Sequence, residues 1–166
     1  MADTAPKLDT PTDLASNAVN TVADALNGIL ADSYALYIKT KNFHWHVSGP
    51  HFRDYHLMLD EQAAQILGTT DDIAERVRKI GATTLRSIGD IARRQSIEDN
   101  DAGFVAPTAM LKELHADNLG LVTALRHAKE LADDADDNGT SGLIDVWTDF
   151  AERRAWFLFE TTRDQA

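Results

Sequence analysis

The chain has 166 residues, a formal net charge of −11 and no cysteine. Because cysteine is absent, disulfides and thiolate metal sites are excluded, and any metal must be held by nitrogen and oxygen ligands. The acidic balance disfavours nonspecific binding to nucleic acid, which relies on Lys and Arg to neutralise phosphates, and it suits the attraction of cations. Solubility alone would explain the charge equally well.

Residues 1–14 carry no apolar run, so the sequence predicts no signal peptide. No stretch approaches the length of about 18 consecutive apolar residues that a membrane span requires. We therefore expect a cytoplasmic protein without a membrane partner. Residues 1–14 should form a flexible tail, and residues 15–166 should form a single domain.

Apolar and small residues recur in steps of three or four over residues 15–47 and again over residues 52–80. This period predicts two long amphipathic helices, each with one apolar face. Ser48, Gly49 and Pro50 are expected to end the first helix, and Gly81 fits a stop for the second. The two helices should form an antiparallel hairpin with Pro50 near its middle.

The rest of the chain also has a helical pattern. Residues 85–95 predict a short helix, residues 97–104 predict a loop, and Pro107 is well placed to open a third long helix. The run DDADDNGTSG, residues 133–142, is expected to break this helix before a fourth one from about Leu143 to Thr161. Four long helices, with a short one between the second and third, predict an all-α four-helix bundle.

Histidines flank the predicted hairpin turn symmetrically. His44 lies six residues before Pro50 and His56 six residues after it, so the two side chains can face each other. Asp60 lies one helical turn beyond His56 on the same face. Two histidines and one carboxylate are a ligand set suited to non-haem iron. The sequence therefore predicts a candidate metal site at His44, His56 and Asp60.

Two further carboxylates, Asp71 and Glu75, share the face of His56 and Asp60 but cannot share a metal with them. At 1.5 Å per residue, Asp60 and Asp71 are about 16 Å apart along the helix. If two copies of the helix crossed antiparallel about a two-fold axis near Gln65, Asp71 and Glu75 of one chain would meet His56 and Asp60 of the other. An intersubunit metal site is one interpretation, and an ordinary solvated helix face is the other.

The motif N-F-H-W-H-V-x-G-P-x-F-x-x-x-H-x-x-L-D, followed after ten residues by D-D-I-A-E-R, resembles the Dps family (DNA-binding protein from starved cells, or mini-ferritins). The similarity covers most of the chain. It implies a ferritin-like four-helix bundle that assembles as a hollow homododecamer. It also implies oxidation of Fe(II), preferably by hydrogen peroxide rather than O2, and storage of ferric mineral inside.

The resemblance also implies roles for individual residues. By position, the ferroxidase ligands would be His44, His56 and Asp60 of one chain with Asp71 and Glu75 of its partner. Trp45 matches a tryptophan beside that site which is thought to limit radical escape; packing in the core is the alternative, and both can hold. The acidic residues at the junction of the third and fourth helices are candidates for an iron entry pore, or form an ordinary acidic loop: Asp133, Asp134, Asp136, Asp137 and Asp145.

DNA binding and the remaining histidines lead to further expectations. The first 14 residues hold one lysine against three aspartates, so direct DNA binding and a nucleoid location are the alternative function rather than the expected one. A bundle that kept the fold and lost the chemistry is a third interpretation. His46 and His51 are not expected to be ligands of this site. His46 could bind a different metal, form a hydrogen bond across an interface or have no role, and His115 and His127 are expected to be structural.

Overall fold

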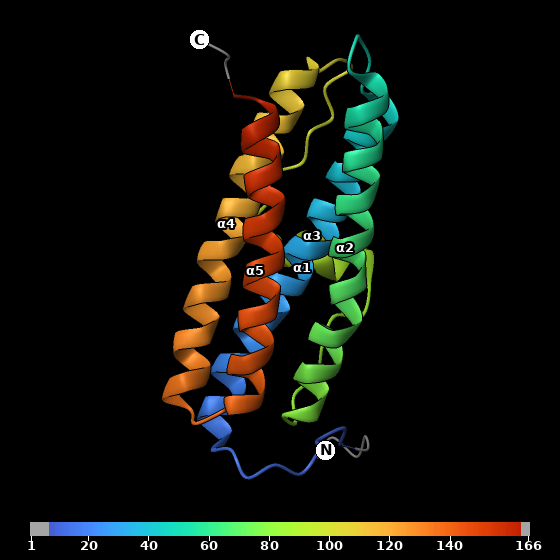
Figure 1. Cartoon of the computed structure of the whole chain (residues 1–166). Helices are drawn as coiled ribbons and strands as arrows, with labels where there is room; N and C mark the ends of the chain where they lie inside the picture. The colour runs from blue at the N-terminus through green and yellow to red at the C-terminus, as the bar shows by residue number, and fades with distance from the viewer. Residues whose placement is uncertain (1–6, 164–166) are drawn as a thin grey trace.

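The computed structural model describes residues 7–163. Residues 1–6 of the predicted tail and residues 164–166 of the predicted domain lie outside the described residues. The described chain folds into α1 (Ser16–His46), α2 (Phe52–Lys79), α3 (Ile88–Arg94), α4 (Pro107–Asp134) and α5 (Asn138–Thr161), with no strand among these residues. Figure 1 shows the four long helices side by side in a bundle, which confirms the predicted fold class.

The bundle is built from two helical hairpins. α1 packs on α2, α4 packs on α5, and α1 also contacts α4. Gly49 turns the first hairpin with a φ of 108°, a conformation that glycine adopts readily, and the backbone N–H of Phe52 donates to its carbonyl. The core is formed by fully buried aliphatic and aromatic side chains on the inward faces, among them Leu26, Phe43, Leu59, Ile66, Leu114 and Leu158. Hydrophobic burial on these faces positions the first hairpin.

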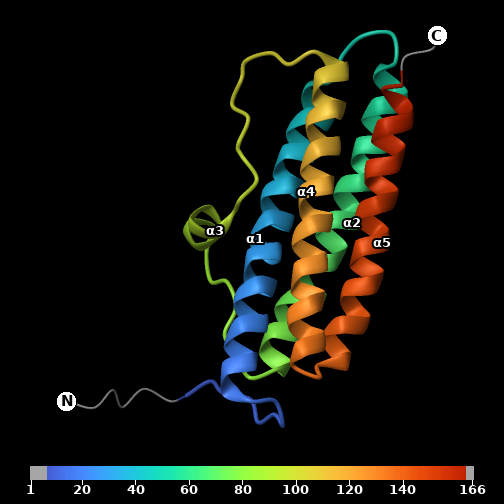
Figure 2. The same ribbon diagram turned by 90° about the vertical axis from the view of Figure 1, so that its left-hand side faces the viewer.

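The long connection between α2 and α4 runs outside the bundle beside α1 and carries the short helix α3 (Figure 2). Polar side chains fasten it. The backbone N–H groups of Ser96 and Ile97 both donate to the buried carboxylate of Asp32 on α1, and the Ser96 hydroxyl donates to the same group. Asp32 is only 6% exposed, so these hydrogen bonds compensate the burial of its charge.

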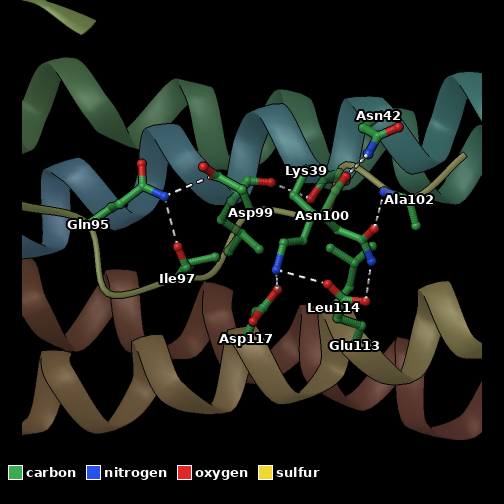
Figure 3. A network of polar contacts seen from close by, with 12 residues as sticks. Lys39, Asn42, Gln95, Ile97, Asp99, Asn100, Ala102, Glu113, Leu114 and Asp117 are labelled. Carbon is green, nitrogen blue, oxygen red and sulfur yellow. Dashed lines mark hydrogen bonds and ion pairs between the residues drawn. The ribbon is translucent and has the colours of Figure 1, made fainter. Parts of the chain in front are cut away.

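A second polar network ties the connection to α1 and α4 (Figure 3). Lys39 is buried and forms ion pairs with Asp117 at 2.8 Å and Glu113 at 3.1 Å. The amide of Asn100 donates to Glu113, and the amide of Asn42 donates to the Asn100 carbonyl. These contacts anchor a connection that is otherwise poor in buried apolar side chains.

The junction of α4 and α5 differs from the prediction. Only residues 135–137 separate the helices, and the segment NGTSG lies inside α5 rather than in a loop. Asp136 has a φ of 55°, which turns the chain, and the Asp137 side chain accepts a hydrogen bond from the Thr140 backbone N–H. This N-cap starts α5 five residues before the predicted Leu143.

None of the helices in residues 7–163 combines the length and the hydrophobicity needed to cross a membrane.

Candidate metal centre

The turn at Pro50 brings two histidines into contact, as their spacing predicts. The rings of His44 on α1 and His56 on α2 stack with their centroids 3.8 Å apart and their planes at 19°. His44 is buried and His56 is half-buried. The prediction that the two side chains face each other across the hairpin is confirmed.

Backbone carbonyl groups fix the orientation of both rings. Nδ1 of His44 lies 2.7 Å from the carbonyl oxygen of His56, and Nδ1 of His56 lies 2.8 Å from the carbonyl oxygen of His44. Because a carbonyl oxygen only accepts, each Nδ1 must carry a hydrogen and donate it. In a neutral imidazole this leaves the lone pair on Nε2, the nitrogen available to a metal ion. The backbone carbonyls thus fix both rings with Nε2 as the nitrogen that could bind a metal ion.

Asp60 lies next to this pair but is engaged by another side chain. Its Oδ1 is 3.8 Å from Nε2 of His44 and 2.7 Å from Nζ of Lys41. The hydrogen bond and the charge of Lys41 hold the pKa of the Asp60 carboxyl below its usual value, and His44 and His56 lower it less. Asp60 is therefore an ionised carboxylate at neutral pH, paired with an ammonium group.

Lys41 is a residue of this centre that the sequence pattern did not reveal. It lies three residues before His44 on α1, so it projects from nearly the same face of the helix. That spacing is the one signal in the sequence, and it does not show that the lysine reaches a carboxylate on the other helix of the hairpin. A metal ion at Asp60 must compete with this ammonium group.

Asp71 and Glu75 lie further along α2 and are exposed to solvent. Glu75 forms an ion pair with Lys79 at 3.0 Å, and neither carboxylate reaches the histidine pair of its own chain. Within residues 7–163 of one chain, no group of three His, Asp or Glu side chains is close enough to hold a metal ion. The chain brings three of the five predicted ligands into one neighbourhood and leaves two apart.

The exposed face of α2 has an internal symmetry. His56 pairs with Glu75, Asp60 with Asp71, and Ala64 with Leu67 about a single midpoint between residues 65 and 66. Leu67 is 41% exposed although it is a large aliphatic residue, and Ala64 is also exposed. The face therefore has small and apolar residues at its centre and potential metal ligands toward both ends.

A family model described as a ferritin-like domain matches residues 23–164. The "DNA protection during starvation protein" of Brevibacillus brevis is 34% identical over 137 residues, which cover 82% of this chain and 91% of that protein. The chain belongs to the Dps family of ferritin-like proteins.

Solved structures agree with this membership. A Dps protein from Bacillus brevis superposes with a TM-score of 0.86 at 30% identity, covering 90% of this chain and 100% of that one. DpsC from Streptomyces coelicolor gives a TM-score of 0.91 at 25% identity, covering 98% of this chain and 97% of that one. The resemblance to Dps proteins that the N-F-H-W-H motif predicts is confirmed, as is the ferritin-like bundle.

Trp45 of this Dps chain lies on the surface. It is 59% exposed, and Nζ of Lys41 lies 5.8 Å from its ring centroid. Packing of Trp45 in the core of its own chain, the alternative considered from the sequence, is therefore wrong. The indole instead lies beside the ammonium group that engages Asp60.

The other histidines lie outside the centre. His46 is exposed and its Nδ1 is within 2.8 Å of the Asn42 carbonyl, while His51 is exposed beside the turn. His115 packs against the ring of Phe159. His127 is 67% exposed, and its Nδ1 lies 3.9 Å from Oε2 of Glu130.

The acidic residues of the α4–α5 junction divide into two groups in this Dps chain. Asp137 is buried, caps α5 and forms an ion pair with Arg76 of α2, so its carboxylate is part of the fold. Asp145 is paired with Lys129 at 3.0 Å. Four of the five pore candidates are exposed and keep the predicted role as a hypothesis: Asp133, Asp134, Asp136 and Asp145.

Proposed function

We propose that this Dps-family protein oxidises Fe(II), preferably with hydrogen peroxide, and stores the ferric product inside a hollow dodecamer, which protects DNA from oxidative damage. The observation that carries the proposal is the His44–His56 pair, whose Nδ1 groups are both held by backbone carbonyls. Two Nε2 lone pairs next to the Asp60 carboxylate form a ligand set that suits Fe(II). Iron is here the substrate and the cargo.

The ligand types account for the direction of the reaction. Imidazole nitrogens bind Fe(II) and capture it, while hard carboxylate oxygens favour Fe(III) over Fe(II) and so make oxidation more favourable. Hydrogen peroxide accepts two electrons and two protons to give two water molecules, and two Fe(II) ions supply one electron each. Transfer of both electrons to one peroxide molecule avoids its one-electron cleavage, which releases hydroxyl radical.

The exposed face of α2 supports a site shared by two subunits. An antiparallel crossing of two copies about the midpoint between residues 65 and 66 would set His56 opposite Glu75 and Asp60 opposite Asp71. The same crossing would cover Ala64 and Leu67, which are exposed in one chain. Each two-fold dimer would then hold two identical sites, each with His44, His56 and Asp60 from one chain and Asp71 and Glu75 from the other.

Replacement of both histidines tests the proposal. His44→Ala combined with His56→Ala should slow the initial rate of peroxide-dependent Fe(II) oxidation at least about tenfold. The reason is that removal of two ligands should lower the affinity of the site for Fe(II) by more than about tenfold. The rate is followed by the near-ultraviolet absorbance of Fe(III), and assembly by size-exclusion chromatography.

The matched control is His51→Ala combined with His127→Ala, which removes two exposed imidazoles and should leave the rate unchanged. An assembled His44→Ala, His56→Ala protein that oxidises iron at the rate of the unmodified protein would refute the ligand assignment.

Direct DNA binding and compaction is the second candidate function. The name of the Brevibacillus brevis relative refers to DNA protection, which iron oxidation would also provide. The net charge of −11 opposes contact with a polyanion, and Lys7 is the one basic residue among residues 1–14. We therefore propose protection by iron chemistry in the cytoplasm rather than by coating of the nucleoid.

A further inference from the structure

A guanidinium group of α5 is largely buried and has no carboxylate partner among residues 7–163. Arg154 of α5 is 4% exposed. Its Nε donates to Oδ1 of Asn118 on α4 at 2.8 Å, and its Nη1 donates to Oε1 of Gln65 on α2 at 2.9 Å. Both acceptors are neutral amides, and Nη2 makes no hydrogen bond to any of residues 7–163. No Asp or Glu in that range forms an ion pair with Arg154.

The missing partner has an energetic consequence. Burial lowers the pKa of the Arg154 guanidinium to about 10, so the group is still a cation at neutral pH. A buried charge without a counter-charge is costly, and buried arginines are normally paired for this reason. The chain has 27 acidic residues, so the lack of a partner here does not come from a shortage of carboxylates. An anion from outside the chain would compensate the charge.

A hollow lies against this group between α2 and α5, two helices that pack only sparsely on each other. Its volume is about 150 Å³, and the residues that line it are Met58, Glu61, Gln62, Gln65, Arg153, Arg154 and Phe157. A hollow of this volume has room for a small ion such as one tetrahedral oxyanion.

The lining of the hollow is rich in hydrogen-bond donors. Arg153 is exposed, its guanidinium lies 5.3 Å from the Phe157 ring centroid, and no carboxylate of the described residues pairs with it. Gln65 uses its oxygen to accept from Arg154, which leaves its amide N–H groups free to donate. Glu61, an exposed residue, is the one acidic side chain among the described lining residues and pairs with neither arginine. The two arginines leave the hollow with a net positive charge.

We propose that this hollow binds a small oxyanion of the phosphate class, held by the guanidinium groups of Arg153 and Arg154 and the amide of Gln65. Guanidinium groups form short, charge-assisted and often bidentate hydrogen bonds to phosphate oxygens, which suits a site composed of donors. The proposal goes beyond iron oxidation and does not depend on it, because none of these three residues is a predicted iron ligand.

Calorimetric titration of the assembled, iron-free, full-length protein with inorganic phosphate at constant ionic strength tests the site. We expect saturable binding of one phosphate per subunit, whereas chloride gives no saturable heat. Arg153→Gln removes one charged donor from an exposed position and should weaken binding about tenfold. Arg126→Gln is the matched control, since it removes an exposed arginine of α4 with the same change in charge and should leave binding unchanged.

A second variant tests the role of the unpaired charge and does not remove Arg154 itself. Gln65→Glu places a carboxylate where the glutamine oxygen already accepts from Arg154. We expect it to abolish phosphate binding and to raise the melting temperature measured without phosphate. The absence of saturable binding to the unmodified assembly at about 10 mM phosphate would overturn the proposal. So would binding that Arg153→Gln and Gln65→Glu leave unchanged, or a partner carboxylate found in the hollow of the assembled protein.

Discussion

At the scale of single residues, the two kinds of ligand in the candidate centre are prepared differently. His44 and His56 are held by each other's backbone carbonyls, so their tautomers depend on the geometry of the hairpin and on no other side chain. Asp60 is held by the ammonium group of Lys41. The sequence predicted the histidine pair because both positions are counted from one proline. It could not predict the lysine contact, which depends on side-chain reach between α1 and α2.

The contact between Lys41 and Asp60 leads to a prediction at this scale. Lys41→Met keeps the length of the side chain and removes the ammonium group. A metal ion that binds Asp60 then no longer has to displace that group. Because an exposed ion pair is weak, we expect affinity for Fe(II) to rise by no more than about fivefold. Anaerobic Fe(II) titration of the assembled protein measures it. Lys112→Met, an exposed lysine of α4, controls for the change in net charge, and equal affinities in both variants would argue against competition by Lys41.

At the scale of helices and connections, the periodic segments were predictable and the junctions were less so. The apolar repeat placed both ends of α1 and α2 within one residue of their observed positions. The prediction for the α4–α5 junction is wrong because Asp, Asn, Gly and Ser are turn-forming residues, and residues 133–142 contain little else. Asp137 starts α5 early because it caps the helix and pairs with Arg76. That partner lies 61 positions away, so local composition cannot report it.

Removal of the Asp32 carboxylate should release the connection that carries α3. Asp32→Ala leaves the backbone N–H groups of Ser96 and Ile97 without their acceptor, and hydrogen bonds to a charged group contribute about 1.5–3 kcal/mol each. We expect a loss of about 2–4 kcal/mol in the free energy of unfolding, measured in urea at a fixed protein concentration.

The control for Asp32→Ala is Asp24→Ala on the same helix. Asp24 pairs with Arg94 but is 81% exposed, so its removal should cost less than about 1 kcal/mol. Equal losses in the two variants would contradict a special role for Asp32 in holding the connection.

At the scale of the whole molecule, the family and the bundle followed from the sequence, while a centre with all five predicted ligands would need more than one chain. The N-F-H-W-H motif and the helical period together predicted a Dps-like bundle, which the comparisons confirm. The pairing of Asp71 and Glu75 with a second chain stays a prediction. One chain cannot bring all five predicted ligands to one metal ion, because about 16 Å of helix separates Asp60 from Asp71 within a subunit.

Mixing two inactive proteins tests the shared site. One variant lacks the histidines (His44→Ala, His56→Ala), and the other lacks the distant carboxylates (Asp71→Asn, Glu75→Gln). Random dimers formed by reassembly of an equal mixture would contain intact ligand sets at about a quarter of their sites. We expect the mixture to recover about that fraction of the unmodified rate of iron oxidation. A rate no higher than the mean of the two variants alone would rule out an intersubunit arrangement.

The acidic charge of the molecule predicts the outcome of a gel-shift experiment. Linear duplex DNA incubated with the assembled protein in low-salt buffer should run unretarded, because there are few cations to displace the counterions of the phosphates. Retardation that disappears as salt is added would revive direct DNA binding as a function of this protein.

The separation of the ligands along α2 also determines how the protein responds to dilution. A lone subunit holds His44 next to His56, with Asp60 paired to Lys41 and Glu75 paired to Lys79. In the proposed arrangement such a subunit is catalytically silent, and each active site appears only when two subunits meet. By mass action, activity per chain then rises with protein concentration through the range in which subunits associate. Newly synthesised chains would stay inactive toward iron until enough of them had accumulated to enclose the product.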